Sequence, residues 1–209
     1  MDRGRISRRQ MLGLLAAGFL TACSSSRREH GAALPSTTSS SAPAAASPLP
    51  FTKTLPGVRF LFLDANHPDD AQAKWLGDQL AAPAPPLFTV AVFHQPVFSC
   101  GLHGRTPEVI THWYGALDSG GVSLVLNGHD HEYQRFLTAE GTTFIVTGGG
   151  GRELYPMIPG CSAPEMRVGA VKHHFTGIEV YSDRMAVTAV ATDGSVIDHV
   201  DIPAPLPAP

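Results

Sequence analysis

The middle of the chain switches between apolar runs and helical spacing, and this pattern predicts the order β-α-β-α-β. Near-continuous apolar runs are typical of strands that are buried on both faces of a sheet. The three runs are 58–64, 87–93 and 122–126. Between them, apolar residues near helical spacing predict a helix over 69–82. A second helix is predicted over 106–117, with Thr106 as N-cap and Pro107 in the first helical position.

Beyond residue 140 the pattern becomes that of further strands. They are predicted at 142–147, 175–181, 185–191 and 196–202. Asp193-Gly194 is a turn dipeptide and predicts a hairpin between the last two. The fold class is therefore α/β, with a β-α-β-α-β unit followed by antiparallel strands.

The N-terminal segment is typical of an export signal. A basic start is followed by an apolar run from Met11 to Ala22, which is too short to span a bilayer. We expect residues 1–22 to be a signal peptide.

Two short motifs refine this interpretation. SRRQML at 7–12 resembles a twin-arginine export motif. LTAC at 20–23 resembles a bacterial lipobox, which implies a lipid on Cys23 after cleavage. The alternative is an ordinary signal peptide in which the cysteine falls by chance. We expect an exported lipoprotein on the extracytoplasmic face of the cell membrane, bound to it through Cys23.

Ser, Thr, Ala and Pro dominate the segment that follows Cys23. Residues 23–56 have no apolar periodicity and bury too little surface to offset the entropy of ordering the chain. We expect a disordered linker there and a single domain over 57–203. The Pro-rich end, 204–209, is expected to be a tail.

Composition narrows the choice of partners. The chain of 209 residues is 43% hydrophobic and 16% charged, as globular proteins are. Its formal net charge is -3, and without residues 1–22 it has 11 Lys and Arg against 17 Asp and Glu, or -6. A nucleic-acid-binding protein presents a basic face. The composition therefore excludes nucleic acid as a partner.

Histidines follow two of the predicted buried strands. His94 stands directly after 87–93, and His129 and His131 follow 122–126 within the sequence NGHDH. Ligand sites form at the carboxyl ends of strands in α/β sheets, and neutral imidazole binds zinc, iron and related ions. The pattern predicts a metal site made of these three histidines. The alternative for each of them is a hydrogen-bonded polar residue with no ligand.

Three motifs in this order resemble one family. They are FHQPVFSC at 93–100, VSLVLNGHDHEYQR at 122–135 and TGGGGRELY at 147–155. Together they resemble the purple-acid-phosphatase-like branch of the calcineurin-like metallophosphoesterases. The resemblance covers about 57–203 and corresponds to the C-terminal half of the family's domain. It implies part of a four-layer sandwich, in which helices flank a β-sandwich.

The resemblance implies an enzyme that hydrolyses phosphoric esters. Family members use two ions, of iron, zinc or manganese, to clamp a small phosphoester and to activate water. By motif position, His94 and His129 would bind the second ion and His131 the first. His103 resembles the family's histidine that contacts phosphate or protonates the leaving group, and its alternative is an exposed bystander. Tyr133 and Arg135 are expected to support the motif rather than to act.

The resemblance also implies motifs that this chain does not show. The family places Asp-x-His or Asp-x-Asp, then Gly-Asp-x-x-Asp or -Tyr, then Gly-Asn-His-Asp or -Glu, ahead of its single histidine. The look-alikes here, Asn66-His67 and Gly77-Asp78, are in the wrong order. We therefore expect one bound ion and an impaired hydrolase. We also expect a bare sheet edge at 58–64 or 87–93.

Several alternatives stay open. Cys100 and Cys161 either pair or remain free thiols. The glycines at 148–151 either form a turn in which two backbone segments approach closely or cradle a phosphate. The second interpretation lacks the Lys-Ser/Thr and the helix that a P-loop needs. His173 and His174 are expected to be structural. Besides a hydrolase, the chain is compatible with a non-catalytic lipoprotein that binds metal or phosphate, or with a surface adhesion module.

Overall fold

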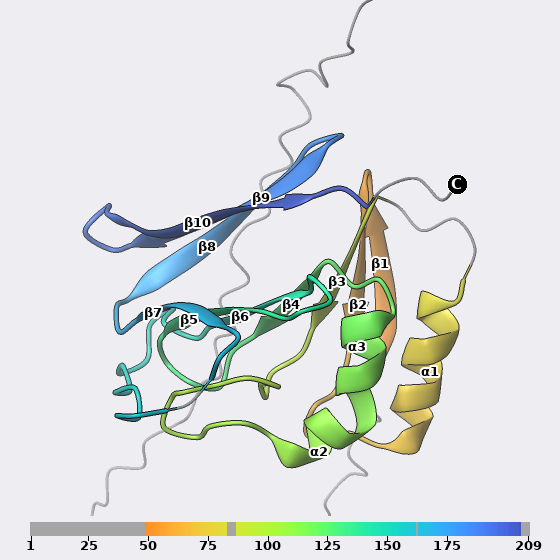
Figure 1. Cartoon of the computed structure of the whole chain (residues 1–209), viewed down its shortest axis with the longest axis horizontal. Coiled ribbons are helices and arrows are strands. Elements are labelled where there is room, and N and C mark those ends of the chain that lie inside the picture. The colour runs from red at the N-terminus through yellow and green to blue at the C-terminus, as the bar shows by residue number, and fades with distance from the viewer. Residues whose placement is uncertain (1–48, 83–86, 162, 206–209) are drawn as a thin grey trace, which may run out of the picture.

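Two β-sheets pack face to face, and helices cover the outer face of the larger sheet (Figure 1). The structure, a computed structural model, describes residues 49–82, 87–161 and 163–205. The predicted signal peptide, Cys23, most of the predicted linker and residues 206–209 lie outside the described residues. No helix within the described ranges is long and apolar enough to cross a membrane.

The larger sheet has the strand order β1-β2-β3-β4-β6-β5-β7. Its strands are β1 (Phe51–Leu55), β2 (Val58–Phe62), β3 (Phe88–Val92), β4 (Leu124–Asn127), β5 (Tyr133–Leu137), β6 (Thr143–Thr147) and β7 (Met166–Ala170). β2, β3, β4 and β6 run parallel, while β1, β5 and β7 pair antiparallel with their neighbours. The three apolar runs thus form β2, β3 and β4 in the parallel centre of the sheet. The strand at 143–147, expected among the antiparallel strands, is instead parallel to β4.

The smaller sheet is an antiparallel meander. It contains β8 (His174–Val180), β9 (Arg184–Ala191) and β10 (Val196–Pro203), in the order β10-β9-β8. Gly194, at a φ of 84°, makes the turn between β9 and β10, as the Asp193-Gly194 dipeptide predicts. These strands are the blue ribbons that lie over the larger sheet in Figure 1.

Helices lie on the opposite face of the larger sheet. α1 spans Asp70–Leu80, and the Asp69 side chain caps it by accepting a hydrogen bond from the backbone N–H of Gln72 (2.8 Å). The second predicted helix is α2 (Pro107–Val109), a π-helical turn η2 (Ile110–Tyr114) and α3 (Gly115–Ser119). Thr106 stands at the N-cap position, but its side chain makes no capping hydrogen bond.

The core consists of two buried layers. One lies between the larger sheet and the helices, where Trp113 is fully buried and packs edge-on against Phe93 at 5.2 Å between ring centroids. The other lies between the two sheets, where Phe88 faces Met185 and Val187. The family's four-layer sandwich is thus represented here by helices, sheet and sheet.

The linker predicted over 23–56 is wrong at its end, because residues 51–55 form β1. This strand pairs with β2 through a tight turn in which Gly57 has a φ of 80°. Phe51 stacks on Phe62 at 4.6 Å, which stabilises the pairing. The Pro56-Gly57 dipeptide was the available sequence signal for this turn.

The predicted bare edge at β2 or β3 is also wrong. β1 covers the free side of β2, and β3 lies between β2 and β4. The outer strand is β1 itself, which carries exposed Lys53. A charged residue on an edge strand opposes pairing with another chain.

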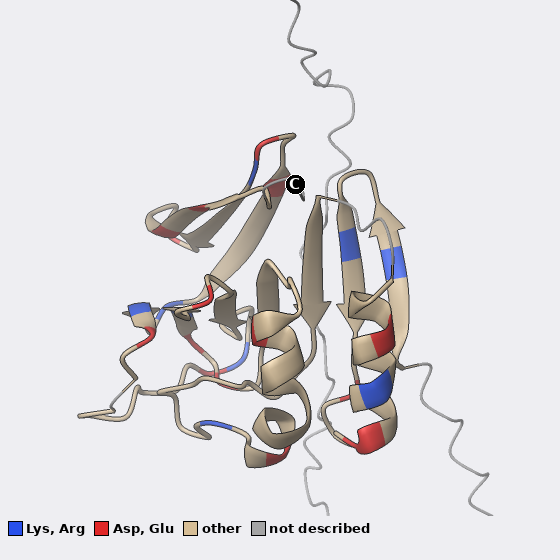
Figure 2. Cartoon of the chain, turned by 45° about the vertical axis from the view of Figure 1, so that its right-hand side comes forward, with Lys and Arg blue, Asp and Glu red and all other residues tan. Residues whose placement is uncertain are grey.

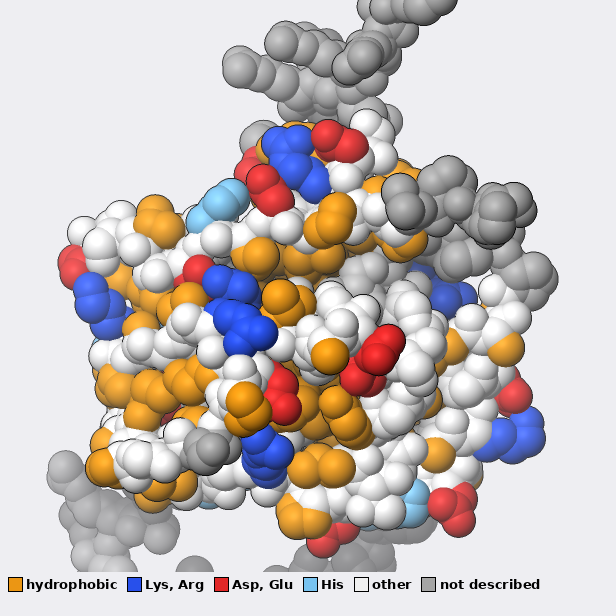
Figure 3. Space-filling view, in the orientation of Figure 1, with side chains coloured by type: hydrophobic (Ala, Val, Ile, Leu, Met, Phe, Trp, Pro, Cys, Tyr) orange, Lys and Arg blue, Asp and Glu red, His pale blue; other side chains and the backbone are white. Residues whose placement is uncertain are grey.

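Charges of both signs are scattered over the molecule. Figure 2 shows Lys and Arg on strands, helix and loops, with Asp and Glu among them, and Figure 3 shows the same mixture on one face.

Candidate metal centre

The parallel pairing of β3 and β4 brings two predicted ligands together. These neighbouring strands end at Val92 and Asn127, and the next turns carry His94 and His129. The Nε2 of His94 lies 3.3 Å from the Nδ1 of His129, and the rings meet edge-on at 5.1 Å between centroids. The backbone N–H of Gly128 donates to the carbonyl of His94 (3.0 Å), which ties the two turns to each other.

His129 has an unusual backbone. Its φ is 68°, and among the described residues other than glycine no other has a positive φ. This left-handed conformation costs a non-glycine residue roughly 1–2 kcal/mol. Strain of this kind concentrates at functional sites, and here it turns the ring toward His94.

The spacing of the two nitrogens fits one metal ion. Two nitrogens bound tetrahedrally at about 2.0–2.1 Å from a zinc-like ion lie about 3.3–3.4 Å apart. Burial, followed by the neighbouring histidines, lowers the pKa of both His94 and His129. Both rings therefore favour the neutral form, which binds metal.

His131 is oriented differently. Its Nδ1 lies 2.8 Å from the backbone carbonyl of Glu153, and its ring stacks on Tyr155 at 4.1 Å between centroids. A carbonyl on Nδ1 places the proton there and leaves Nε2 available as a ligand. In the described part of the chain, however, no group of three or more His, Cys, Asp or Glu side chains is arranged to hold an ion. The structure thus joins His94 to His129 and leaves His131 outside a ready ligand group.

His103 lies in the site rather than away from it. Its ring is 4.3 Å from that of His129 and 5.2 Å from that of Tyr155, measured between centroids. Its side chain is 40% exposed, so one face is open to solvent. His103 thus lies beside His129 and is partly open to solvent, which is compatible with a group that contacts substrate.

The carboxylates in and around the site are engaged elsewhere. Asp64 accepts hydrogen bonds from Asn66 and contacts His67 (3.1 Å), and Asp78 pairs with Lys74 (2.7 Å) on α1. Asp130 is fully buried in contact with the loop that carries His103. The described residues therefore fit one imidazole-bound ion and do not fit a carboxylate-bridged pair.

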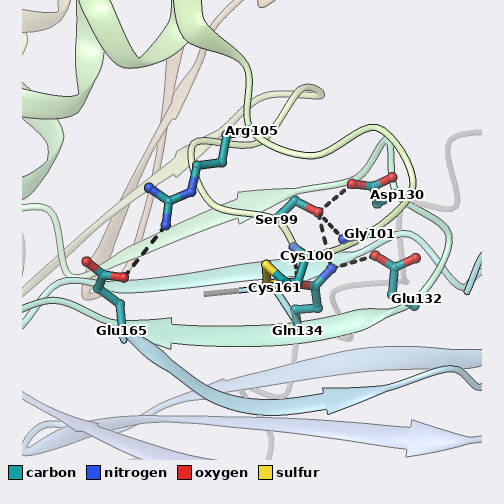
Figure 4. Close-up of a disulfide and its surroundings, with 9 residues drawn as sticks. All are labelled: Ser99, Cys100, Gly101, Arg105, Asp130, Glu132, Gln134, Cys161 and Glu165. Carbon is teal, nitrogen blue, oxygen red and sulfur yellow. Dashed lines mark hydrogen bonds and ion pairs between the residues drawn. A yellow bond between two sulfur atoms is a disulfide. The ribbon is translucent and has the colours of Figure 1, made fainter. Parts of the chain in front are cut away.

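Asp130 and Glu132 were missed by the sequence reasoning. Both are fully buried, and burial, followed by the charge of Asp130, raises the pKa of Glu132 to about 7. Their alternation with Gln134 was the available signal, because residues two apart lie on one side of an extended segment. All three side chains point toward the 99–101 segment (Figure 4).

Tyr133 and Arg135, which follow the motif, bind to the smaller sheet. Both contact Asp198 on β10: the Tyr133 hydroxyl donates to it at 2.8 Å and the Arg135 Nε at 2.6 Å. Burial, followed by this hydrogen bond, raises the pKa of Tyr133. These contacts join the strand after the NGHDH motif to the smaller sheet.

Cys100 and Cys161 form a disulfide, which settles the alternative left open by the sequence (Figure 4). Gln134 on β5 accepts a hydrogen bond from the backbone N–H of Cys100 (2.7 Å), so one end of the disulfide is held against β5. Cys161 follows the segment that carries Tyr155. The bond therefore ties two loops of the site together.

Substituting Cys161 with serine should lower the free energy of unfolding by about 4 kcal/mol, since the bond closes a 61-residue separation. Chemical denaturation of oxidised wild type, reduced wild type and C161S measures the effect. Reduced wild type and C161S should unfold at the same denaturant concentration. Equal midpoints for all three proteins would show that the bond contributes nothing.

The glycines after β6 form the close-approach turn that was one of the two interpretations of the sequence, because Gly149 lies against Lys172 and His174. A Cβ on Gly149 would lie 2.6 Å from the carbonyl of Lys172 and would also overlap the ring of His174. His174 is buried and contacts Lys172 and Thr147, which agrees with the structural role expected of it.

Comparison with known proteins shows sequence similarity to acid phosphatases. No family model matches the chain. It is 27% identical over 141 residues to tartrate-resistant acid phosphatase type 5 of Rattus norvegicus and 33% identical over 141 residues to that of Mus musculus. It is 25% identical over 113 residues to purple acid phosphatase 4 of Arabidopsis thaliana. The chain spans 42% of the length of the two mammalian relatives, over 63% of its own.

Solved structures share the fold. Purple acid phosphatase PPD1 from yellow lupin matches 73% of this chain and 32% of its own, with a TM-score of 0.67 and 16% identity. GAP50, the anchor in the inner membrane complex of Plasmodium, matches 74% of this chain and 53% of its own, with a TM-score of 0.63 and 19% identity. The chain is therefore similar in sequence to acid phosphatases over part of their length, and it shares its fold with the structure of purple acid phosphatase PPD1.

Proposed function

We propose that the chain is a metal-dependent hydrolase of small phosphoric esters. The observation that carries this proposal is the 3.3 Å approach of His94 Nε2 and His129 Nδ1 at the carboxyl ends of two parallel strands. Relatives named as acid phosphatases support the reaction class. The ion would be iron or zinc, which imidazole suits, or manganese, which the family resemblance also implies.

Each histidine has a separate task in this proposal. His94 and His129 hold the ion through neutral rings. His131, whose Nδ1 contacts the carbonyl of Glu153, keeps its Nε2 for a first ion that the pair does not bind. A bound ion stabilises charge on the phosphoryl group and acidifies water. His103, half-open to solvent beside His129, gives a proton to the leaving oxygen.

We infer that turnover is weaker than a two-ion centre would give. The carboxylates described above are hydrogen-bonded or ion-paired, and none is placed to bridge two cations. The same observation favours a second candidate, a protein that binds one ion or phosphate at these histidines without turnover. A bound ion with no hydrolysis would establish that candidate.

The proposed location is the extracytoplasmic side of the membrane, with a lipid on Cys23. The Cys100–Cys161 disulfide supports export, because disulfides persist in oxidising compartments. Mass spectrometry of Cys23-containing peptides from the membrane fraction tests the anchor.

The test of function uses the full chain loaded separately with iron, zinc or manganese. Bound metal is counted by elemental analysis, and hydrolysis is followed with 4-nitrophenyl phosphate and bis(4-nitrophenyl) phosphate. We expect about one ion per chain and hydrolysis of at least one ester, with activity lost on chelation and restored by the ion. A chain that binds no ion and hydrolyses neither ester contradicts the proposal.

A further inference from the structure

The loop between β3 and α2 carries His103, and it has no regular secondary structure to hold it. A catalytic side chain on such a loop needs fixed neighbours to keep its orientation. Here one carboxylate oxygen makes both of the necessary contacts. The Oδ1 of Asp130 accepts from the backbone N–H of His103 at 2.9 Å and lies 2.9 Å from the ring Nδ1.

The carboxylate of Asp130 is itself held from the other side. Its Oδ2 accepts a hydrogen bond from the hydroxyl of Ser99, whose oxygen in turn accepts from the backbone N–H of Gly101 (2.9 Å) (Figure 4). The Asp130 side chain is fully buried. Ser99 at the start of the loop and His103 near its end therefore hold the Asp130 carboxylate in one orientation.

The loop reaches this carboxylate because position 101 is glycine. A Cβ at Gly101 would lie 2.5 Å from the Cγ of Asp130 and would overlap Glu132 as well. A larger residue forces either the loop or the two buried carboxylates to move. Gly101 thus offers a way to disturb the contact between His103 and Asp130 while both residues are kept.

The contacts determine which ring nitrogen of His103 faces the site. The same Oδ1 already accepts from the backbone N–H of His103, so we assign it as the acceptor for the ring as well, with the proton on Nδ1. The Nε2 is then the nitrogen left for the substrate, on a ring that lies 4.3 Å from His129.

We propose that Asp130 is a positioning residue that holds the Nδ1 side of the His103 ring and fixes the tautomer of its neutral form. The Nε2 then faces the leaving oxygen and gives it a proton when the ring is doubly protonated, which returns the ring to the Nδ1-protonated form. The inference rests on the proposed function. It assigns Asp130 a task within the NGHDH motif that is separate from metal binding by His129 and His131.

The first test measures the tautomer in the metal-free full chain. Side-chain nitrogens of histidine are observed by long-range ¹⁵N–¹H correlation, and H103Q assigns the signal of His103. We expect the Nδ1-protonated tautomer in wild type and a mixed or Nε2-protonated signal in D130A and in G101A. Restoration of the wild-type signal by D130N, which keeps an oxygen acceptor, supports the hydrogen-bond explanation. D78A, on the exposed face of α1, should match wild type.

The second test uses the metal-loaded protein and two esters that differ in leaving group. Protonation matters more for phenyl phosphate than for 4-nitrophenyl phosphate. We expect D130A to lower kcat for phenyl phosphate about tenfold more than for 4-nitrophenyl phosphate, with bound metal and KM unchanged. Circular dichroism confirms that the variants are folded, and G101A provides the same comparison if D130A is not.

The outcomes separate the two ideas. The positioning role is overturned if His103 of the wild type is Nε2-protonated. It is also overturned if the tautomer of His103 is unchanged in both D130A and G101A, whatever the activity. A wild-type protein with the expected tautomer but no hydrolysis contradicts the proposed function and leaves only the geometric part of the inference standing.

Discussion

Replacing His129 with alanine should abolish hydrolysis and weaken metal binding by more than about a hundredfold. Loss of a residue that merely supports a metal ligand costs 10–100-fold in affinity, and a ligand contributes more. His129 is half of the His94–His129 pair, whose nitrogens lie 3.3 Å apart. Elemental analysis and titration with a competing chelator measure the loss, and the hydrolysis assay is run on the same samples.

Two further variants make this result interpretable. H129N tolerates the left-handed backbone at φ 68° better than alanine does, so it separates loss of the ligand from backbone strain. H199A removes an exposed histidine of β10 that contacts Thr188, outside the pair, and should keep both metal and activity. Metal binding that survives in H129A would remove the basis for the site.

The second large effect concerns Asp198, which joins the two sheets. Substituting it with alanine should lower the free energy of unfolding by about 3 kcal/mol, because the partly buried charge of Arg135 and the buried hydroxyl of Tyr133 then lose their acceptor. In the folded protein Asp198 accepts from Arg135 Nε at 2.6 Å and from Tyr133 at 2.8 Å. Thermal or urea denaturation measures the change.

Asp201 gives the matched control on the same strand. Its side chain is 50% exposed and pairs with Arg184 at 3.2 Å. An exposed ion pair contributes up to about 1 kcal/mol, so D201A should be nearly neutral. Equal losses in D198A and D201A would show that the buried network has no special weight.

The sequence predicts the parallel centre of the fold because burial on both faces leaves an unmistakable apolar run. The outer strands carry no such run. In β1, the residues before Leu55 are exposed, and β7 alternates between half-buried and exposed positions around Gly169. Their pairing depends on neighbours distant in the chain, so local pattern alone does not define them.

In the candidate site, too, some residues could be predicted from the sequence and others could not. His94 and His129 were predictable because each follows a buried strand, and parallel strands end at one edge of a sheet. The task of Asp130 was not, since it depends on a loop that folds back from residue 99 to residue 103. The π-helical turn η2, in which Trp113 is fully buried, was likewise not predicted, since the sequence pattern indicated one continuous helix.

The Cys100–Cys161 bond also changes what a break in the backbone would do. The stretch that it encloses contains β4, β5 and β6 and every residue of the NGHDH motif. Cleavage of one peptide bond inside this covalent ring converts it into two arms that remain joined through sulfur. A protein nicked there by a protease would keep its histidines attached to the rest of the domain until a thiol reductant opened the bond.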